Sequence, residues 1–238
     1  MISSLHPATF LLLGSLALPL LKGRLRKVLL VVLPAAGFVN LLGFEAGTVW
    51  TTWFAGYELQ ILRLDKLSLL FGYLFHIAAF LAAIYSLHVD DGLQHTTGLM
   101  YAGSAVGAVF AGDLITLFVF WELLAVTSVF QIWARRTERS ANAGMRYLLM
   151  HVTSGLFLLV GTALHYSETG SLIFEFMGLG GWASRFILLA IGIKCAFPLL
   201  HTWLVDAYPE ATPTGTVFLS AFTTKTAVYA LARGFAGT

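Results

Sequence analysis

Three ionisable residues stand inside long apolar stretches of this sequence. Glu122 lies in LFVFWELLAV, Lys194 in ILLAIGIKCAFP and Lys225 in FLSAFTTKTAVYAL. A charged side chain at the centre of a bilayer costs about 2.5–3.5 kcal/mol on insertion scales, and such residues commonly lie on an ion or proton pathway. A carboxylate followed by two lysines therefore predicts a row of proton-exchanging groups, because the proton affinity of each depends on the charge of the next. The alternative interpretation of Glu122 is an ion pair that only holds two helices together.

Two histidines are candidates for the same row. His151 lies in the apolar segment after the arginine-rich turn, and His201 follows Lys194 closely. Histidine titrates near neutral pH, so either ring could hold a proton or a water between Glu122 and the lysines. A neutral, hydrogen-bonded core histidine is an equally good interpretation of His151. The candidate relay is Glu122, Lys194, Lys225, His201 and His151.

The composition predicts the environment of these residues. The chain has 238 residues, of which 58% are hydrophobic and 11% charged, and its mean hydropathy is +0.82. Soluble domains carry about 25% charged residues, so a membrane protein is favoured. The net charge is only +2 and no dense basic run is present, so no nucleic-acid partner is expected. The single cysteine, Cys195, excludes an internal disulfide, and neither a metal nor a cofactor is expected.

The hydropathy pattern predicts an all-α polytopic membrane protein with about eight transmembrane helices, each of about 20 residues. The first apolar run precedes the basic cluster 22–27, an order typical of a membrane helix and not of a cleaved signal peptide. The connection 45–64, rich in Thr, Trp and Tyr, predicts a small outer β-hairpin. The expected spans are 5–21, 27–44, 65–88, 95–111, 114–134, 141–165, 183–205 and 214–233.

The distribution of Lys and Arg predicts the orientation. With the N-terminus outside, eight basic residues fall on the cytoplasmic side and four on the outer side; the other two of the 14 lie within spans. The positive-inside rule therefore favours an outer N-terminus and an outer C-terminus. The cytoplasmic set is Lys22, Arg24, Arg26, Lys27, Arg135, Arg136, Arg139 and Arg146, and the outer set is Arg63, Lys66, Arg185 and Arg233.

Helix geometry places the ionisable groups at similar depths. Asp113 can cap a helix that starts just after it, so Glu122 lies about 13 Å along that helix, near the bilayer centre. Pro198 cannot donate a hydrogen bond to the carbonyl of Lys194, and the helix is expected to break there. Broken helices line ion sites in transporters. Lys225 lies about 16 Å from the start of the last span.

The segments FVFWELL and GIKCAFPLLHTWLVDAYPEATPTGTVFLSAFTTKTAVYAL resemble the antiporter-like subunits of Mrp-type cation/proton antiporters and respiratory complex I. The resemblance covers about residues 65–233, and the D-type Mrp subunit, with its relatives, looks nearest. In that family a glutamate and a lysine before a helix break form a charge pair, and a later lysine passes the ion or proton onward. The matching positions are Glu122, Lys194 and Lys225, and His201 matches the histidine just beyond the break.

The resemblance implies a division of the chain into three parts. Residues 1–64 would be two transmembrane helices with the outer hairpin, 65–94 a third helix and cytoplasmic loop, and 95–238 one five-helix proton-channel repeat. Family members have about fourteen helices with two inverted repeats, so the chain is expected to be half of a split subunit whose second repeat lies on another membrane protein of the same complex. A minor departure is VDAY at 205–208, where the family often has PDAH. The expected location is the inner membrane of a bacterium or archaeon.

Three functional hypotheses follow. The first is a subunit that translocates H⁺, with Na⁺ or K⁺ left open, through a buried Glu–Lys–Lys relay inside a larger complex. The second is a structural membrane subunit that keeps the charges as packing pairs and docks a redox or transport module. The third is a quinone-binding redox subunit, which is weaker because the sequence has no ligand cluster for haem or an iron–sulfur centre.

Overall fold

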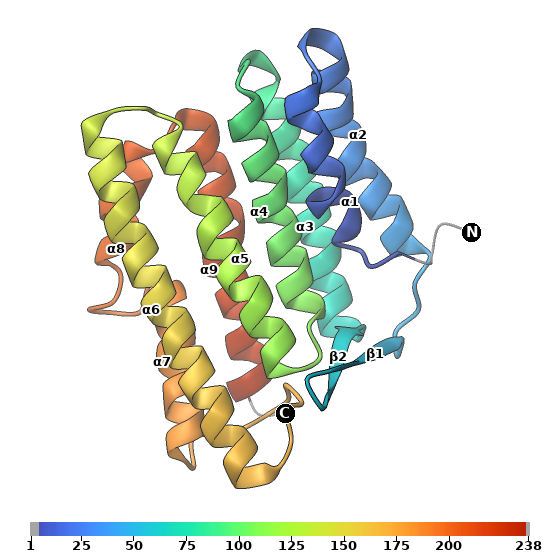
Figure 1. Ribbon diagram of the computed structural model, residues 1–238, viewed down its shortest axis with the longest axis vertical. Helices are drawn as coiled ribbons and strands as arrows, with labels where there is room; N and C mark the ends of the chain where they lie inside the picture. The colour runs from blue at the N-terminus through green and yellow to red at the C-terminus, as the bar shows by residue number, and fades with distance from the viewer. Residues whose placement is uncertain (1–4, 237–238) are drawn as a thin grey trace.

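The computed structural model describes residues 5–236 as a bundle of helices with one small β-hairpin at its lower end (Figure 1). The helices run roughly parallel and antiparallel to one long axis, and α3 and α9 lie behind α4 and α5 in this view. The predicted helical architecture with a two-stranded antiparallel sheet is confirmed. The elements are α1 (Thr9–Leu12), η1 (Gly14–Leu20), α2 (Gly23–Leu42), β1 (Val49–Phe54), β2 (Tyr57–Arg63), α3 (Lys66–Tyr85), η2 (Ser86–His88), α4 (Gly92–Phe110), α5 (Leu114–Trp133), α6 (Glu138–Thr169), α7 (Trp182–Lys194), α8 (Thr202–Ala207), η3 (Tyr208–Glu210) and α9 (Pro213–Phe235).

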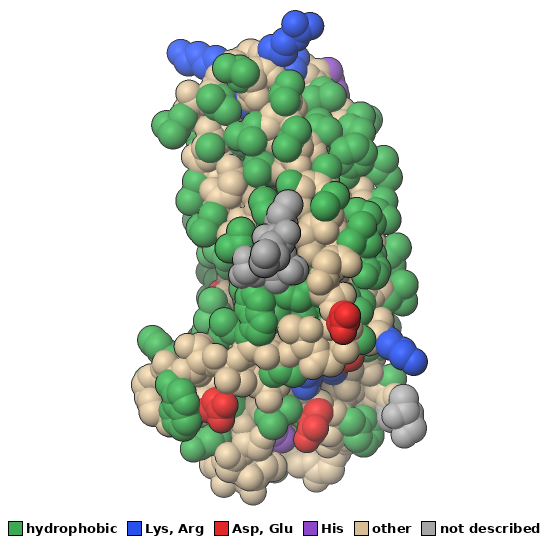
Figure 2. Space-filling model, turned by 90° about the vertical axis from the view of Figure 1, so that its right-hand side faces the viewer, with side chains coloured by type: hydrophobic (Ala, Val, Ile, Leu, Met, Phe, Trp, Pro, Cys, Tyr) green, Lys and Arg blue, Asp and Glu red, His purple; other side chains and the backbone are tan. Residues whose placement is uncertain are grey.

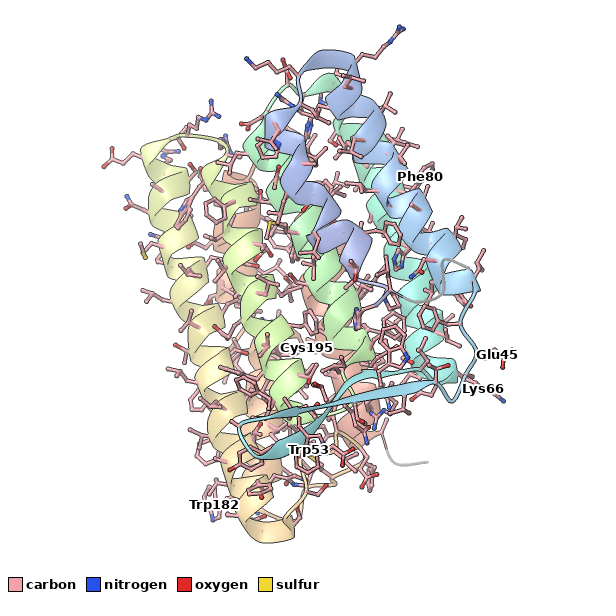
Figure 3. The ribbon with its side chains drawn as sticks, turned by 45° about the vertical axis from the view of Figure 1, so that its right-hand side comes forward. Glu45, Trp53, Lys66, Phe80, Trp182 and Cys195 are labelled. Carbon is pink, nitrogen blue, oxygen red and sulfur yellow. The ribbon has the colours of Figure 1, made fainter. Side chains whose placement is uncertain are left out.

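The outer surface of the bundle is suited to lipid. Four helices in the described residues, α2, α3 with η2, α5 and α6, are long and apolar enough to cross a membrane. Hydrophobic side chains cover the middle of the face shown in Figure 2, while Lys and Arg project from its upper end. Trp53 on the hairpin and Trp182 at the start of α7 are exposed at the lower end (Figure 3). Aromatic residues at this level are typical of a membrane–water interface.

The first expected span, 5–21, is wrong as a spanning helix. The chain forms only the short helical stretch Thr9–Leu20, in which a four-residue α-helix gives way to a 3₁₀ helix. Two local features account for this. The Ser15 hydroxyl donates to the carbonyl of Leu12 (2.9 Å), and Pro19 supplies no backbone donor inside η1. About 20 α-helical residues are needed to cross the hydrocarbon core, so this stretch is too short.

Side-chain caps fix where the central helices begin. The Asp65 carboxylate accepts from the Ser68 amide (2.8 Å) at the start of α3, and Asp113 accepts from the Thr116 amide (2.7 Å) at the start of α5. Each cap satisfies a backbone donor that the helix itself leaves free. The predicted Asp113 cap is therefore confirmed, and it fixes the register of the helix that carries Glu122.

The expected break in the span 183–205 is present. The helix α7 ends at Lys194, and α8 begins only at Thr202. Between them, Ala196 and Leu199 have positive φ values of 57° and 71°, a conformation that L-residues rarely adopt. The 13 residues of α7 cover about 20 Å, less than the ~30 Å hydrocarbon core. Cys195, the residue after Lys194, lies near mid-height of the bundle (Figure 3).

The two ends of the bundle are held differently. We call the end with the turns at 20–23, 88–92, 134–138 and 208–212 the ion-paired end, and the opposite end the hairpin end. At the hairpin end, backbone hydrogen bonds join separate segments: Gly112 N to Gln60 O, Phe174 N to Gly112 O and Met177 N to Gly234 O, each 2.9 Å. Four ion pairs connect the other end: Arg26–Asp90 (3.0 Å), Arg136–Asp91 (2.8 Å), Arg135–Glu210 (3.8 Å) and Arg146–Asp206 (2.7 Å).

Candidate functional site

Lys194 is fully buried at the end of α7. Its ammonium donates to the backbone carbonyl of Trp121 on α5 (2.5 Å) and lies 4.5 Å from the centroid of the Trp121 ring. A carbonyl and a π face both attract a cation. These two contacts hold the buried charge against the residue that directly precedes Glu122.

Glu122 is half-buried, and its carboxylate points at α6. Its Oε1 is buried and has no hydrogen-bond partner within residues 5–236. No direct ion pair joins Glu122 and Lys194 in the described part of the chain. The resemblance implied a charge pair, whereas the structure places the Lys194 ammonium on the carbonyl of Trp121 and the Glu122 carboxylate against Gly155 of α6.

His151 lies about one turn before Ser154 and Gly155, on the same buried face of α6. It is fully buried, and its ring centroid is 4.1 Å from that of Tyr147 and 4.5 Å from that of Trp203. Its charge would interact with that of Lys194. Neither ring nitrogen has a hydrogen-bond partner among the described residues. A buried polar atom of this kind is costly unless a partner or water satisfies it.

A chain of buried hydroxyl groups crosses the bundle from Tyr147, whose ring packs against that of His151. The Tyr147 hydroxyl is 2.8 Å from Ser128 Oγ and 3.5 Å from Thr223 Oγ1. Thr223 Oγ1 is in turn 2.5 Å from the Tyr101 hydroxyl. Hydroxyl groups both donate and accept, so such a chain can relay a proton. Neither Ser128 nor Tyr101 was predicted from the sequence, because a single hydroxyl in an apolar span gives no distinctive signal.

A second cluster of hydrogen-bonded polar side chains, around Gln131 and Gln94, lies further toward the ion-paired end. The Gln131 amide donates to Thr97 Oγ1 (2.8 Å) and to the Gln94 carbonyl (3.1 Å). The Gln94 amide donates to Thr212 Oγ1 (2.6 Å) and also to Thr214 Oγ1. Gln131, a polar residue in an apolar span nine residues after Glu122, was the sequence feature that could have predicted this cluster. Together the hydroxyl chain and this cluster lead from mid-bundle toward the turn at 208–212.

Two predicted site residues lie apart from this interior group. Lys225 is exposed on the outer face of α9, and its ammonium donates to the Ser220 carbonyl one turn earlier (2.6 Å). His201 is exposed at the start of α8. The structure therefore brings Glu122, Lys194 and His151 together and leaves Lys225 and His201 on the surface. In residues 5–236, no cluster of three His, Cys, Asp or Glu side chains is suited to holding a metal.

Comparisons with known proteins identify the family to which the chain belongs. Residues 111–236 match the family model for the transmembrane domain of NADH:quinone oxidoreductases and Mrp antiporters. The chain is 32% identical over 187 residues to the A-type subunit of the Na⁺/H⁺ antiporter of Alkalihalophilus pseudofirmus, covering 71% of this chain and 23% of that protein. It is 29% identical over 203 residues to NADH-quinone oxidoreductase subunit M of Escherichia coli K12, covering 76% of this chain and 40% of that protein.

Solved structures show the same fold. A chain of the Mrp complex from Dietzia superposes with a TM-score of 0.81 at 23% identity, covering 94% of this chain and 27% of that chain. A chain of respiratory complex I from Thermus thermophilus superposes with a TM-score of 0.78 at 24% identity, covering 96% of this chain and 53% of that chain. The chain thus spans less than half the length of the two sequence relatives. Since the family model covers more than half of this sequence, the chain belongs to the transmembrane family shared by NADH:quinone oxidoreductases and Mrp antiporters.

Proposed function

We propose that this chain translocates protons, or protons in exchange for Na⁺ or K⁺, as one half of an antiporter-like unit in a larger membrane complex. The observation that carries the proposal is the full burial of Lys194, whose ammonium is held by Trp121 while Glu122 stands next to it without closing an ion pair in the described chain. A structural pair would be expected to close fully, because a buried charge is costly without a partner.

The proposed step is a change in the separation of Glu122 and Lys194. The Lys194 ammonium binds the carbonyl of Trp121, the residue directly before Glu122. Moving the carboxylate toward or away from the ammonium changes how tightly Lys194 holds its proton. His151 and the hydroxyl groups of Tyr147 and Thr223 would then accept and pass on the released proton.

Lys225 would receive the proton at the outer face of α9. It follows Thr223 by two residues, and the Thr223 hydroxyl belongs to the buried chain while the Lys225 ammonium faces outward. A lysine at bilayer depth does not face lipid without a large cost. We therefore place the second antiporter-like repeat against this face of α9, on the same polypeptide or on another one. His201 would lie beside the helix break in this arrangement and could hold water there.

The proposed conducting unit is residues 95–238, and its ion-paired end would face the cytoplasm. The ion pairs at that end use Arg26, Arg135, Arg136 and Arg146, and an excess of basic residues favours the cytoplasmic side. The N-terminus and the C-terminus would then both lie outside. The proposed location is the inner membrane of a bacterium or archaeon.

The structural-subunit hypothesis has one observation in its favour. The Lys194 ammonium already has a carbonyl and an aromatic face as partners, which is how a lysine with a purely architectural role would be held. The proton-transport hypothesis requires the charge of Glu122. The structural hypothesis requires only that its side chain fills the same space.

Proton movement in inside-out vesicles that contain the whole native assembly, wild type against Glu122→Gln, separates the two. The substitution keeps the shape of the side chain and removes its charge. We expect proton transport to collapse while the assembly stays intact, because the charge that acts on Lys194 is lost. Unchanged transport would favour the structural hypothesis.

A further inference from the structure

The carboxylate of Glu122 occupies the space that a side chain at position 155 would need. A Cβ atom built on Gly155 would lie 2.5 Å from the Glu122 carboxyl carbon and closer still to Oε1. Carbon atoms that are not bonded to one another approach to about 3.5 Å. The Glu122 side chain can therefore lie against α6 only because residue 155 is a glycine.

Ser154, the residue before Gly155 on α6, hydrogen-bonds to both α5 and α7. Ser154 Oγ accepts from the Trp121 indole (3.0 Å) and donates to the Ala190 carbonyl of α7 (2.7 Å). Trp121 in turn supplies the carbonyl that Lys194 binds. Ser154 and Gly155 thus set the positions of both charged residues relative to α6.

Several other buried glycines at helix contacts accommodate apolar or aromatic side chains, whereas Gly37 lies against the His76 ring and Gly215 against the Gln131 carbonyl. A Cβ at Gly107 would meet the Phe120 ring, one at Gly144 the Trp133 indole, and one at Gly161 the Ile187 side chain. In residues 5–236, Gly155 is the one glycine whose added Cβ would come within 3 Å of a carboxylate. Close helix packing accounts for glycines that face apolar side chains, but at Gly155 the space is filled by a carboxylate.

We propose that Gly155 is a positioning residue for proton translocation: its missing side chain sets where the Glu122 carboxylate lies relative to Lys194. The inference rests on the proposed function, since it assigns no role to Gly155 beyond the placement of Glu122. It also explains why Glu122 and Lys194 form no direct ion pair in the described chain: the carboxylate packs against Gly155 of α6 instead of contacting the ammonium.

The first test is Gly155→Ala in the whole native assembly. The added methyl group collides with the end of a flexible side chain and not with backbone, so the helices can stay in place while the Glu122 carboxylate rotates away. We expect proton transport to fall by up to about 100-fold, the effect that a displacement of roughly 1 Å has on other positioned groups. The amount of assembled complex is expected to stay at the wild-type level.

The second test is rescue by a shorter acid. Glu122→Asp alone withdraws the carboxylate from α6 and should impair transport, whereas Glu122→Asp combined with Gly155→Ala leaves room for the new methyl group. We expect the double variant to transport protons at least 5-fold faster than Gly155→Ala alone. The matched control is Gly144→Ala, which adds the same methyl group to the same helix against Trp133 and should gain nothing from Glu122→Asp.

The outcomes separate this inference from the proposed function. If Glu122→Gln abolishes transport but Gly155→Ala leaves it unchanged, the positioning role is wrong and the proposed function stands. The same conclusion follows if Gly155→Ala impairs transport but Glu122→Asp restores nothing. If Glu122→Gln leaves transport unchanged, the proposed function itself fails.

Discussion

Trp121 on α5 contacts both of the neighbouring helices that form the site, α6 and α7. Its carbonyl accepts from Lys194, its ring lies below the ammonium, and its indole N–H donates to Ser154. Since Glu122 is the next residue, any rotation of α5 at this point moves the carboxylate and the lysine's acceptor together. A short local movement can therefore alter both electrostatic partners of Lys194 at once.

Tyr101→Phe tests the buried hydroxyl chain. The Tyr101 hydroxyl contacts Thr223 Oγ1 (2.5 Å) and accepts from the Thr223 amide (2.8 Å). Its removal leaves a buried hydroxyl without that partner, and we expect the free energy of unfolding to fall by about 0.6–1.5 kcal/mol. Unfolding in mixed detergent–SDS micelles measures this. Tyr85→Phe, at a half-exposed tyrosine, is the control and should change stability by much less.

The sequence predicted the depth of the charged residues but not the direction in which they face. Glu122, Lys194 and Lys225 were all found because charges are rare in apolar spans. An apolar span looks alike on all sides, however, so it does not reveal which side faces protein. The buried pair Thr223 and Thr226, three residues apart, marks the inner face of α9 and would have placed Lys225 on the opposite one.

Pro198 predicts that the seventh expected span is broken, but not the residue at which its helix ends. Pro198 correctly indicated the break, but α7 ends four residues earlier, at Lys194. There the Trp203 indole donates to the Ile193 carbonyl (2.8 Å). This bond satisfies a backbone acceptor that has no helical partner because α7 ends at Lys194. The first span failed for a related reason: composition measures how apolar a segment is, whereas Ser15 and Pro19 affect whether its backbone stays α-helical.

Asp206→Asn tests how α8 is fixed to α6. Arg146 donates to both oxygens of Asp206 (2.7 and 2.8 Å), and these hydrogen bonds lower the pKa of the Asp206 carboxyl below its usual value. A carboxyl whose pKa is lower in the folded state stabilises the fold above its unfolded pKa of about 3.9, and that stabilisation is lost as the pH falls further. The pair is partly exposed, so its contribution to the stability of the fold is small.

Hydrogen–deuterium exchange of residues 202–207 provides the measurement. We expect protection in the wild type to be constant from pH 7 to about pH 4 and to decrease below that, after correction for intrinsic exchange rates. Asp206→Asn should show the lower protection throughout. Asp90→Asn, which removes the exposed partner of Arg26 at the same end, is the control. An equal loss in α8 from both variants would contradict a specific Arg146–Asp206 link.

Lys225→Ala tests whether the exposed lysine of α9 is part of the proton pathway and is covered by a neighbouring protein surface. Lys225 has only the Ser220 carbonyl as a partner within the described chain, so its charge is expected to be satisfied by a neighbouring protein surface. We expect proton transport in vesicles of the native assembly to be lost, with assembly retained. Val228→Ala, which also shortens an exposed side chain of α9, is the control. Normal transport in Lys225→Ala would exclude Lys225 from the pathway.

The two ends of the bundle respond differently to dissolved salt. Raising the ionic strength from 0.1 to 1 M shortens the screening length from about 10 Å to about 3 Å, which weakens exposed pairs such as Arg136–Asp91 and Arg146–Asp206. Backbone hydrogen bonds such as Phe174 N to Gly112 O are affected far less. Dissolved salt therefore loosens the ion-paired end more than the hairpin end, where the ion pair Arg233–Asp65 (2.6 Å) adds to the backbone hydrogen bonds. Helices that separate would then pivot near the hairpin, and ionic strength would change the access of water to the interior mainly from the ion-paired end.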